Sequence, residues 1–135
     1  MTPAIPPIDG WAAATEGSRL VLRSAGATIV VVASEAASAP IDARAVAARL
    51  AAGVAAQWPG AKPEFRSVGV LAGRTVAMQV VGDDASVQLH AVSGTGSTAD
   101  PLLITVATCR RDEVDEVGKV FAHVAAQVVV AEAGA

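Results

Sequence analysis

A chain of 135 residues has the length of one domain, and we take residues 1–135 as a single unit. It carries ten basic and thirteen acidic residues, a formal net charge of -3, no Tyr, two Phe and two Trp. Nucleic-acid binding requires a basic face and usually stacking aromatic rings, so we expect no nucleic-acid partner.

The distribution of apolar residues bears on where the protein resides. No apolar run approaches the ~20 residues that cross a bilayer, so no membrane span is expected. The first eleven residues carry neither Lys nor Arg and no continuous apolar core, unlike a secretory signal. We therefore expect a cytoplasmic protein, unless a leader or a lipobox precedes this sequence in the native protein.

The N-terminal residues 1–10 predict an extended lead-in. Three of them are prolines, which fix the backbone and cannot donate to a strand ladder. Trp11 follows directly, and in a chain so poor in aromatic residues we expect it to anchor this segment on the domain. The alternative is an exposed tryptophan that binds a partner.

The first two predicted strands are residues 19–23 and 28–33. In the former, arginines flank three aliphatic residues, which is typical of an edge or half-buried strand. The latter reads Thr-Ile-Val-Val-Val-Ala, a continuous run. A strand with one covered face alternates polar and apolar residues, so we expect both faces of this strand to be covered. The sheet then needs a layer on each side.

A helix is predicted over residues 41–58, beginning at Pro40 or Ile41 with Ser38 as a candidate cap. Pro59 and Gly60 end it. Its apolar stripe, with residues recurring every four positions, consists of Val46, Leu50, Val54 and Trp58. The small residues at positions 52, 53, 55 and 56 would allow this helix to approach the sheet closely.

Four further strands are predicted in a row, at residues 64–71, 74–81, 85–92 and 102–110. Short turns link them, which favours antiparallel neighbours because parallel pairs need a long crossover. In residues 85–92 apolar side chains alternate with Gln88 and His90, so one face meets the core and the other a wetter environment. With the two earlier strands, the result is an antiparallel sheet of about six strands.

The last helix is predicted over residues 112–132. Its apolar stripe steps by three and four residues through Val114, Val117, Phe121, Val124 and Val128. Acidic residues crowd its first turn, where the helix dipole favours negative charge, and Asp112 is a candidate cap. Gly118 lowers helix propensity and is a candidate for close packing.

No catalytic residue and no cofactor are predicted. Cys109 lies within an expected strand, where we interpret it as a core hydrophobe and not as a reactive thiol. His90 and His123 lack a second ligand at metal-binding spacing, so we expect no metal site. Cys109 and His90 could meet across adjacent strands, but no third group completes such a pair, and two unrelated side chains are the favoured reading.

Three loop or junction segments have weaker signals. Residues 69–75 faintly resemble a phosphate loop, but the spacing is one residue short and the Lys is missing. Residues 93–100 predict a flexible hairpin tip. Residues 110–113 read Arg-Arg-Asp-Glu, which indicates a solvated charge cluster; an anion site is the alternative that the nearby carboxylates disfavour.

The order of predicted elements is a proline-rich lead-in, a Gly-Trp pair, two strands, a helix, four strands and a helix. This order, the phrase Pro-Ile-Asp-Gly-Trp at residues 7–11 and a glycine between paired strands in residues 70–77 resemble the PsbP-like superfamily. That superfamily includes photosystem extrinsic subunits, a eukaryotic Ran-binding protein and actinobacterial LpqN-type lipoproteins. The resemblance implies an antiparallel sheet between helical layers and usually no catalytic activity, and it transfers no functional residue.

We therefore predict one α+β domain in which helices sandwich about six antiparallel strands, as in the PsbP-like α/β/α sandwich. The favoured role is a non-enzymatic protein-binding or accessory domain that contacts a protein partner through a sheet face or residues 93–100. Candidate interaction residues are Trp11, His90, Thr95 and Ser97. The alternative is a carrier of a small ligand or lipid, with an enclosed apolar pocket between the sheet and helix 41–58. A homodimer is a further candidate, because pairing covers a free sheet edge or an apolar patch.

Overall fold

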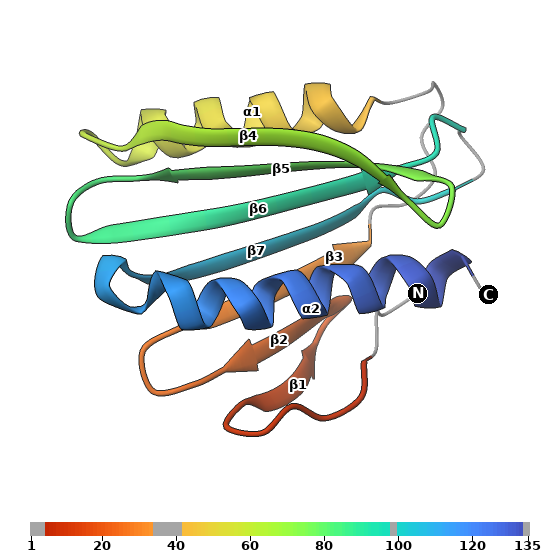
Figure 1. The fold of residues 1–135 in the computed structure, drawn as a ribbon, viewed down its shortest axis with the longest axis horizontal. Coiled ribbons are helices and arrows are strands. Elements are labelled where there is room, and N and C mark those ends of the chain that lie inside the picture. The colour runs from red at the N-terminus through yellow and green to blue at the C-terminus, as the bar shows by residue number, and fades with distance from the viewer. Residues whose placement is uncertain (1–4, 34–41, 98–99, 134–135) are drawn as a thin grey trace.

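The computed structural model describes residues 5–33, 42–97 and 100–133. Within them one sheet has the strand order β1-β2-β3-β7-β6-β5-β4, and every neighbouring pair is antiparallel (Figure 1). The seven strands found there are β1 (Ala12–Glu16), β2 (Arg19–Arg23), β3 (Thr28–Ala33), β4 (Lys62–Leu71), β5 (Arg74–Gly82), β6 (Ser86–Gly94) and β7 (Leu103–Arg110). The predicted α+β class and antiparallel sheet are confirmed, with seven strands in place of about six.

The strand that the sequence did not predict is β1. Its residues read Ala-Ala-Ala-Thr-Glu, without the β-branched or aromatic pattern of a strand, and its first four side chains are exposed. Backbone pairing with β2, from Ala12↔Arg23 to Glu16↔Arg19, holds it in the sheet. A strand held by a backbone ladder alone leaves no hydrophobic pattern in the sequence.

The chain forms two meanders, β1–β3 and β4–β7, in which consecutive strands are neighbours. The meanders join where β3 pairs with β7, from Thr28↔Thr108 to Ala33↔Leu103. Between them in sequence lies α1 (Ala43–Gln57), and α2 (Val114–Ala133) follows β7 through the 3-10 turn η1 (Arg111–Glu113). The two edges of the sheet are therefore β1 and β4.

The N-terminus of α1 differs from the prediction. The carboxylate of Asp42 accepts a hydrogen bond from the backbone N–H of Arg44 at 3.0 Å, so Asp42 is the cap and the helix begins at Ala43. The predicted cap, Ser38, and the predicted first residues, Pro40 and Ile41, lie outside the described residues.

The face that α1 turns to the sheet is also different. Its buried positions are Ala43, Ala47 and Ala51. The predicted stripe of larger residues flanks this alanine face and is only partly buried, and the small residues at 52, 53, 55 and 56 are exposed. Alanines at the contact bring the helix backbone near the sheet, where the amide nitrogen of Gln79 donates to the carbonyl oxygen of Ala47 at 2.6 Å.

The predicted stripe of α2 is confirmed. Its buried members, Val117, Phe121, Val124 and Val128, belong to the larger of the hydrophobic clusters. Asp112 lies within η1, where its carboxylate is 3.4 Å from the Nε of Arg110. A Cβ built on Gly118 would meet no atom within 4 Å, so this glycine does not mark close packing.

The two helices lie on opposite faces of the sheet. Along β6, Val87, Leu89 and Ala91 pack in the cluster that contains the α2 stripe, whereas Val92 packs in the cluster that contains Ala47 of α1. Because side chains alternate along a strand, these two sets point to opposite faces. The helices also cover different strands: α1 mainly contacts β5 and β6, and α2 mainly contacts β7 and β6.

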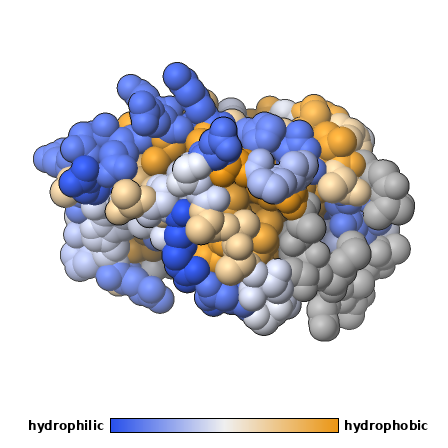
Figure 2. All heavy atoms as spheres, turned by 90° about the horizontal axis from the view of Figure 1, so that it is seen from below, coloured by the Kyte–Doolittle hydropathy of each residue, from blue (hydrophilic) through white to orange (hydrophobic). Residues whose placement is uncertain are grey.

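The continuous run in β3 is buried on one face. Ile29 and Val31 have no exposed surface and pack in the α2 cluster. Val30 and Val32 point to the other face and remain half-buried, because α1 packs on β5 and β6 instead. The prediction that both faces of this strand are covered is therefore met on the α2 face and wrong for the other face. Viewed from below, on the side of β1, the surface shows apolar atoms at its centre and at the upper right, with hydrophilic atoms mainly at the left and the top (Figure 2).

Two glycine-to-alanine changes test this packing in opposite directions. Gly118→Ala should raise the free energy of unfolding by about 1 kcal/mol, because alanine favours the helix and its methyl group meets open space. Gly82→Ala should lower it by about 1–3 kcal/mol, because the added Cβ would lie 2.4 Å from the backbone oxygen of Ser86. Urea unfolding measures both values. If both variants shift stability in the same direction, the packing described at these positions is wrong.

Candidate functional site

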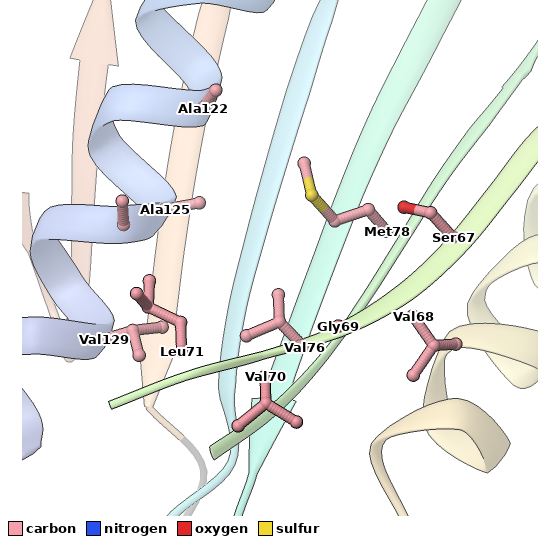
Figure 3. A pocket seen from close by; sticks show the side chains of 11 residues that line it. Ser67, Val68, Gly69, Val70, Leu71, Val76, Met78, Ala122, Ala125 and Val129 are labelled. Atoms are coloured by element: carbon pink, nitrogen blue, oxygen red, sulfur yellow. The ribbon is translucent and has the colours of Figure 1, made fainter. Parts of the chain in front are cut away.

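An apolar groove of about 280 Å³ separates α2 from the end of the sheet formed by β4 and β5 (Figure 3). The strand side is lined by Val76 and Met78 of β5 and by residues 67–71 of β4. The helix side is lined by Ala122, Ala125, Ala126 and Val129. Ser67 is the one lining residue with a polar side chain, so the groove suits an apolar occupant.

The groove exists because α2 lies mainly over β7 and β6 and reaches only the margin of β4. The helix residues that face the gap are mostly alanines, which are too short to fill it. Figure 3 shows Ala122 and Met78 on opposite sides of the gap, with Leu71 next to Val129 where β4 comes closest to the helix. The groove is therefore bounded on its outer side by β4.

The outer side of the groove is an exposed edge strand. All ten residues of β4 are exposed, and no strand of the described residues pairs with its outer edge. Five large hydrophobic side chains are exposed in the described part of the chain, and four of them are on β4. They are Phe65 at 56%, Val68 at 55%, Val70 at 77% and Leu71 at 38% of their surface. Such a concentration of apolar side chains on one free edge is unfavourable in water.

The first half of β4 has features that disfavour pairing with another strand. Pro63 offers no N–H, and the ladder with β5 is irregular between Pro63 and Phe65. Between them, Glu64 accepts hydrogen bonds from both terminal nitrogens of Arg111, at 2.6 and 2.5 Å. These hydrogen bonds hold the pKa of Glu64 below its usual value. Arg111 also donates to the carbonyl oxygen of Asp83, so this half of the strand is linked to η1, the turn that precedes α2.

His90, a predicted interaction residue, is buried on the α1 face with 1% of its surface exposed. The amide nitrogen of Gln79 lies 2.9 Å from its Nδ1. Because that nitrogen can only donate, Nδ1 accepts, and Nε2 carries the proton that it donates to the Oε1 of Gln88 at 3.0 Å. Burial lowers the pKa of His90, so the imidazole is neutral. In this conformation its side chain offers nothing to a partner.

The other predicted interaction residues lie far apart in the sheet order. Trp11 is half-buried against the larger core cluster, just before the edge strand β1. Thr95 and Ser97 are exposed in the loop after β6, where Thr95 donates to Asp100 at 2.8 Å and accepts from the backbone N–H of Ser97 at 3.1 Å. Strands β2, β3 and β7 separate β1 from β6, so only Thr95 and Ser97 lie together.

Cys109 and His90 do not meet. Cys109 pairs with Val87 and packs in the α2 cluster, whereas His90 pairs with Val106 and points to the α1 face. Burial, followed by the nearby carboxylate of Glu113, raises the pKa of the Cys109 thiol and makes it a poor nucleophile. In residues 5–33, 42–97 and 100–133, no group of three or more His, Cys, Asp or Glu side chains could hold a metal ion.

Sequence reasoning missed the groove and the exposure of β4. Residues 64–71 were predicted as one of four consecutive strands, with no statement about their exposure. Phe65, Val68 and Val70 are residue types that are usually buried. Pro63 was the available signal, since proline in a strand is typical of a sheet edge. No signal in the sequence predicts that α2 stops short of this edge.

Comparison with known proteins adds no assignment. The chain matches no family model, and no curated protein matches it. In the part of the chain that the structure describes, neither helix has the length and apolar character that crossing a bilayer would demand.

The buried histidine should make stability depend on pH. The folded state resists protonation of His90, whereas the unfolded chain takes up this proton below about pH 6.5. This contribution to stability is complete above that pH and is lost as the pH falls below it, by at most about 1.4 kcal/mol per pH unit. Urea unfolding between about pH 7.5 and 5.5 should show a smaller loss for His90→Gln than for the unchanged protein.

The matched control is His123→Gln, because His123 is exposed on α2. It should follow the unchanged protein across this pH range. Equal pH dependence of the His90 variant and the unchanged protein would contradict the neutral, buried imidazole.

Proposed function

We propose that this protein is a non-enzymatic binding domain, and that its contact surface consists of residues 67–71 of β4 together with the groove beside α2. One observation carries the proposal: four of the five large exposed hydrophobic side chains in the described residues share this strand, three of them within residues 67–71. Exposed apolar surface of this kind marks interaction sites in soluble proteins. We call residues 67–71 and the groove the β4 surface.

The backbone supports a protein partner. The outer edge of β4 presents N–H and C=O groups that pair with no strand in residues 5–33, 42–97 and 100–133. An extended segment of another protein can satisfy them as an added strand, with side chains that enter neighbouring apolar space. A partner that lacks a peptide backbone would leave this edge unpaired.

A non-enzymatic role is supported by the state of the nucleophilic and titratable side chains. Cys109 and His90 are both buried and face opposite sides of the sheet. Glu16, Glu64 and Asp83 are hydrogen-bonded by Arg23, by Arg111 and by the backbone and Trp58, respectively, and their pKa values are lowered. None of these groups lines the groove.

We also propose a distant relationship to the PsbP-like superfamily. Its support is the order of elements: strands, a helix, four consecutive antiparallel strands and a final helix. The placement of α1 and α2 on opposite faces fits an α/β/α arrangement, and the proposal concerns the fold alone.

A second candidate function is the carriage of a small apolar molecule. The observation that favours it is the groove itself, with about 280 Å³ lined almost wholly by apolar side chains. The groove lies beside α2 and not beside α1, where a carrier pocket was expected. On the α1 side, alanines and the hydrogen bond from Gln79 to Ala47 occupy the interface.

Protein binding at the β4 surface can be tested by photo-crosslinking in cells that make the protein naturally. A photoreactive amino acid at Val70, the most exposed apolar position on β4, should give discrete crosslinked products. The same amino acid at Ala52, which is exposed on α1, should give few. Equal product patterns from the two positions would remove the support for this surface.

Carriage of an apolar ligand can be tested with decanoic acid and native mass spectrometry. A carrier should bind one molecule, and Ala122→Phe should weaken binding about tenfold or more because the ring would fill the groove. Ala131→Phe, exposed on the same helix but away from the groove, should bind like the unchanged protein. Binding that is absent, or unaffected by Ala122→Phe, would rule out this site.

A further inference from the structure

We propose that β4 pairs with β4 of a second copy of this chain, antiparallel and about a two-fold axis at Val68, so that two sheets become one. The inference rests on the proposed function, because it takes β4 as a protein-contact surface and names what covers it. The backbone, the distribution of charge and the order of side chains along β4 each support a second copy.

The turn between β4 and β5 determines which backbone groups are free. Ala72 and Gly73 have φ values of 52° and 77°, the positive angles of a type I′ turn. In such a two-residue hairpin the closing pair, here Leu71↔Arg74, is hydrogen-bonded, and bonded pairs then alternate along the ladder. The residues whose N–H and C=O groups point away from β5 are therefore Arg66, Val68 and Val70.

The protection of β4 ends where these free groups begin. Before Arg66, the strand carries Lys62, Pro63, an irregular ladder and the pair of Glu64 with Arg111. After Arg66 the sequence is Ser-Val-Gly-Val-Leu, with no charge and no proline. The opposite edge of the sheet, β1, is five residues long and mostly alanine. The unprotected segment of β4 is thus the part of the sheet edge suited to pairing.

A two-fold axis at Val68 places compatible side chains of the two copies opposite each other on both faces of the sheet. On the α2 face, Phe65 of one copy lies opposite Leu71 of the other, an aromatic–aliphatic pair. On the α1 face, Val68 lies opposite its own counterpart, and Arg66 lies opposite Val70, so no like charges face each other. An axis at Ser67 or at Gly69 instead places Phe65 opposite a glycine, which leaves the ring without a cross-strand partner.

The second copy also completes the groove. Leu71 lines the groove and lies next to Val129 of α2 (Figure 3). In the Val68 register, Phe65 of the second copy lies opposite Leu71 on the same face, at the open side of the groove. Each protomer then supplies an aromatic side chain to the groove of its partner, which a foreign strand would do only if its sequence provided one.

The size of the contact sets its strength. Pairing over residues 65–71 runs for about 23 Å at 3.3 Å per residue. A single strand edge of this length buries less area than the ~800 Å² per partner of a standard interface. We therefore expect a dimer that dissociates in the micromolar range or above, about 10 μM or weaker. Its detection requires a concentration series and a method that traps it.

Disulfide trapping tests the register. In a hydrogen-bonded antiparallel pair the Cα atoms are about 5.5 Å apart, which lies within the range of Cα distances that disulfides join. Val68→Cys should therefore form a linked dimer on mild oxidation, at least about tenfold faster than Val130→Cys. Val130 is the matched control, because it is 52% exposed on α2 and Val68 is 55% exposed. Cys109 is buried and stays in place in both variants. Equal rates at the two positions would overturn the proposal.

Light scattering over about 10 μM to about 1 mM gives a second readout. The mass of the unchanged protein should rise from 13.4 kDa towards twice that value, and Val130→Lys should behave alike. Val68→Lys should remain at 13.4 kDa, because two lysines would face each other across the axis. A monomer at all concentrations would overturn self-pairing. If Val70 then still crosslinked to another protein in cells, the proposed function would stand with a different partner; loss of both results would remove both.

Discussion

The widths of helices and strands limit how much of the sheet the two helices of this protein can cover. A packed helix is about 10 Å across and neighbouring strands are about 4.8 Å apart, so one helix covers about two strands. The sheet has seven strands in the described residues and two helices, one on each face. Because α1 lies over β5 and β6 and α2 over β7 and β6, both helices overlap at β6 and neither extends over the outer side of β4. The exposure of β4 and the groove beside it follow directly, because two helices are too few to cover a sheet of this width.

Much of the fold was predictable from residue patterns. Alternation and short turns identified the second meander, and a stripe at helical spacing identified α2, because in both cases the buried side chains themselves form the pattern. The buried face of α1 was misassigned for a physical reason. Valine and leucine recur every four residues on this helix, and alanine does so one position later. Hydrophobicity favours the larger residues as the contact with the sheet. In the structure the alanines make this contact, because their small side chains allow a shorter distance between the helix backbone and the sheet.

The candidate site was far less predictable. Val68 and Val70 are of the same residue type as the core valines and recur at a similar spacing. Their exposure depends on where α2 stops, which no local sequence pattern encodes. His90 shows the converse. Its face of β6 was expected to meet a wetter environment, and that prediction is wrong, because His90 is 1% exposed. Gln79 and Gln88 hydrogen-bond the imidazole inside the protein, and a helix carbonyl accepts from Gln79. A polar residue in a sequence therefore indicates that hydrogen-bond partners are needed, but only the fold shows which groups those partners are.

The division of the sheet into two meanders has a consequence for how the chain folds. Each meander consists of hairpins whose partners are close in sequence, and such local contacts form quickly. The seam between β3 and β7 instead brings together residues such as Ile29 and Ala107 across most of the chain. Closing a loop of this length carries an entropic penalty that no contact offsets until the seam is made. The seam is thus the strand pairing with the greatest sequence separation among the described strands, and we expect it to form later than the hairpins of either meander.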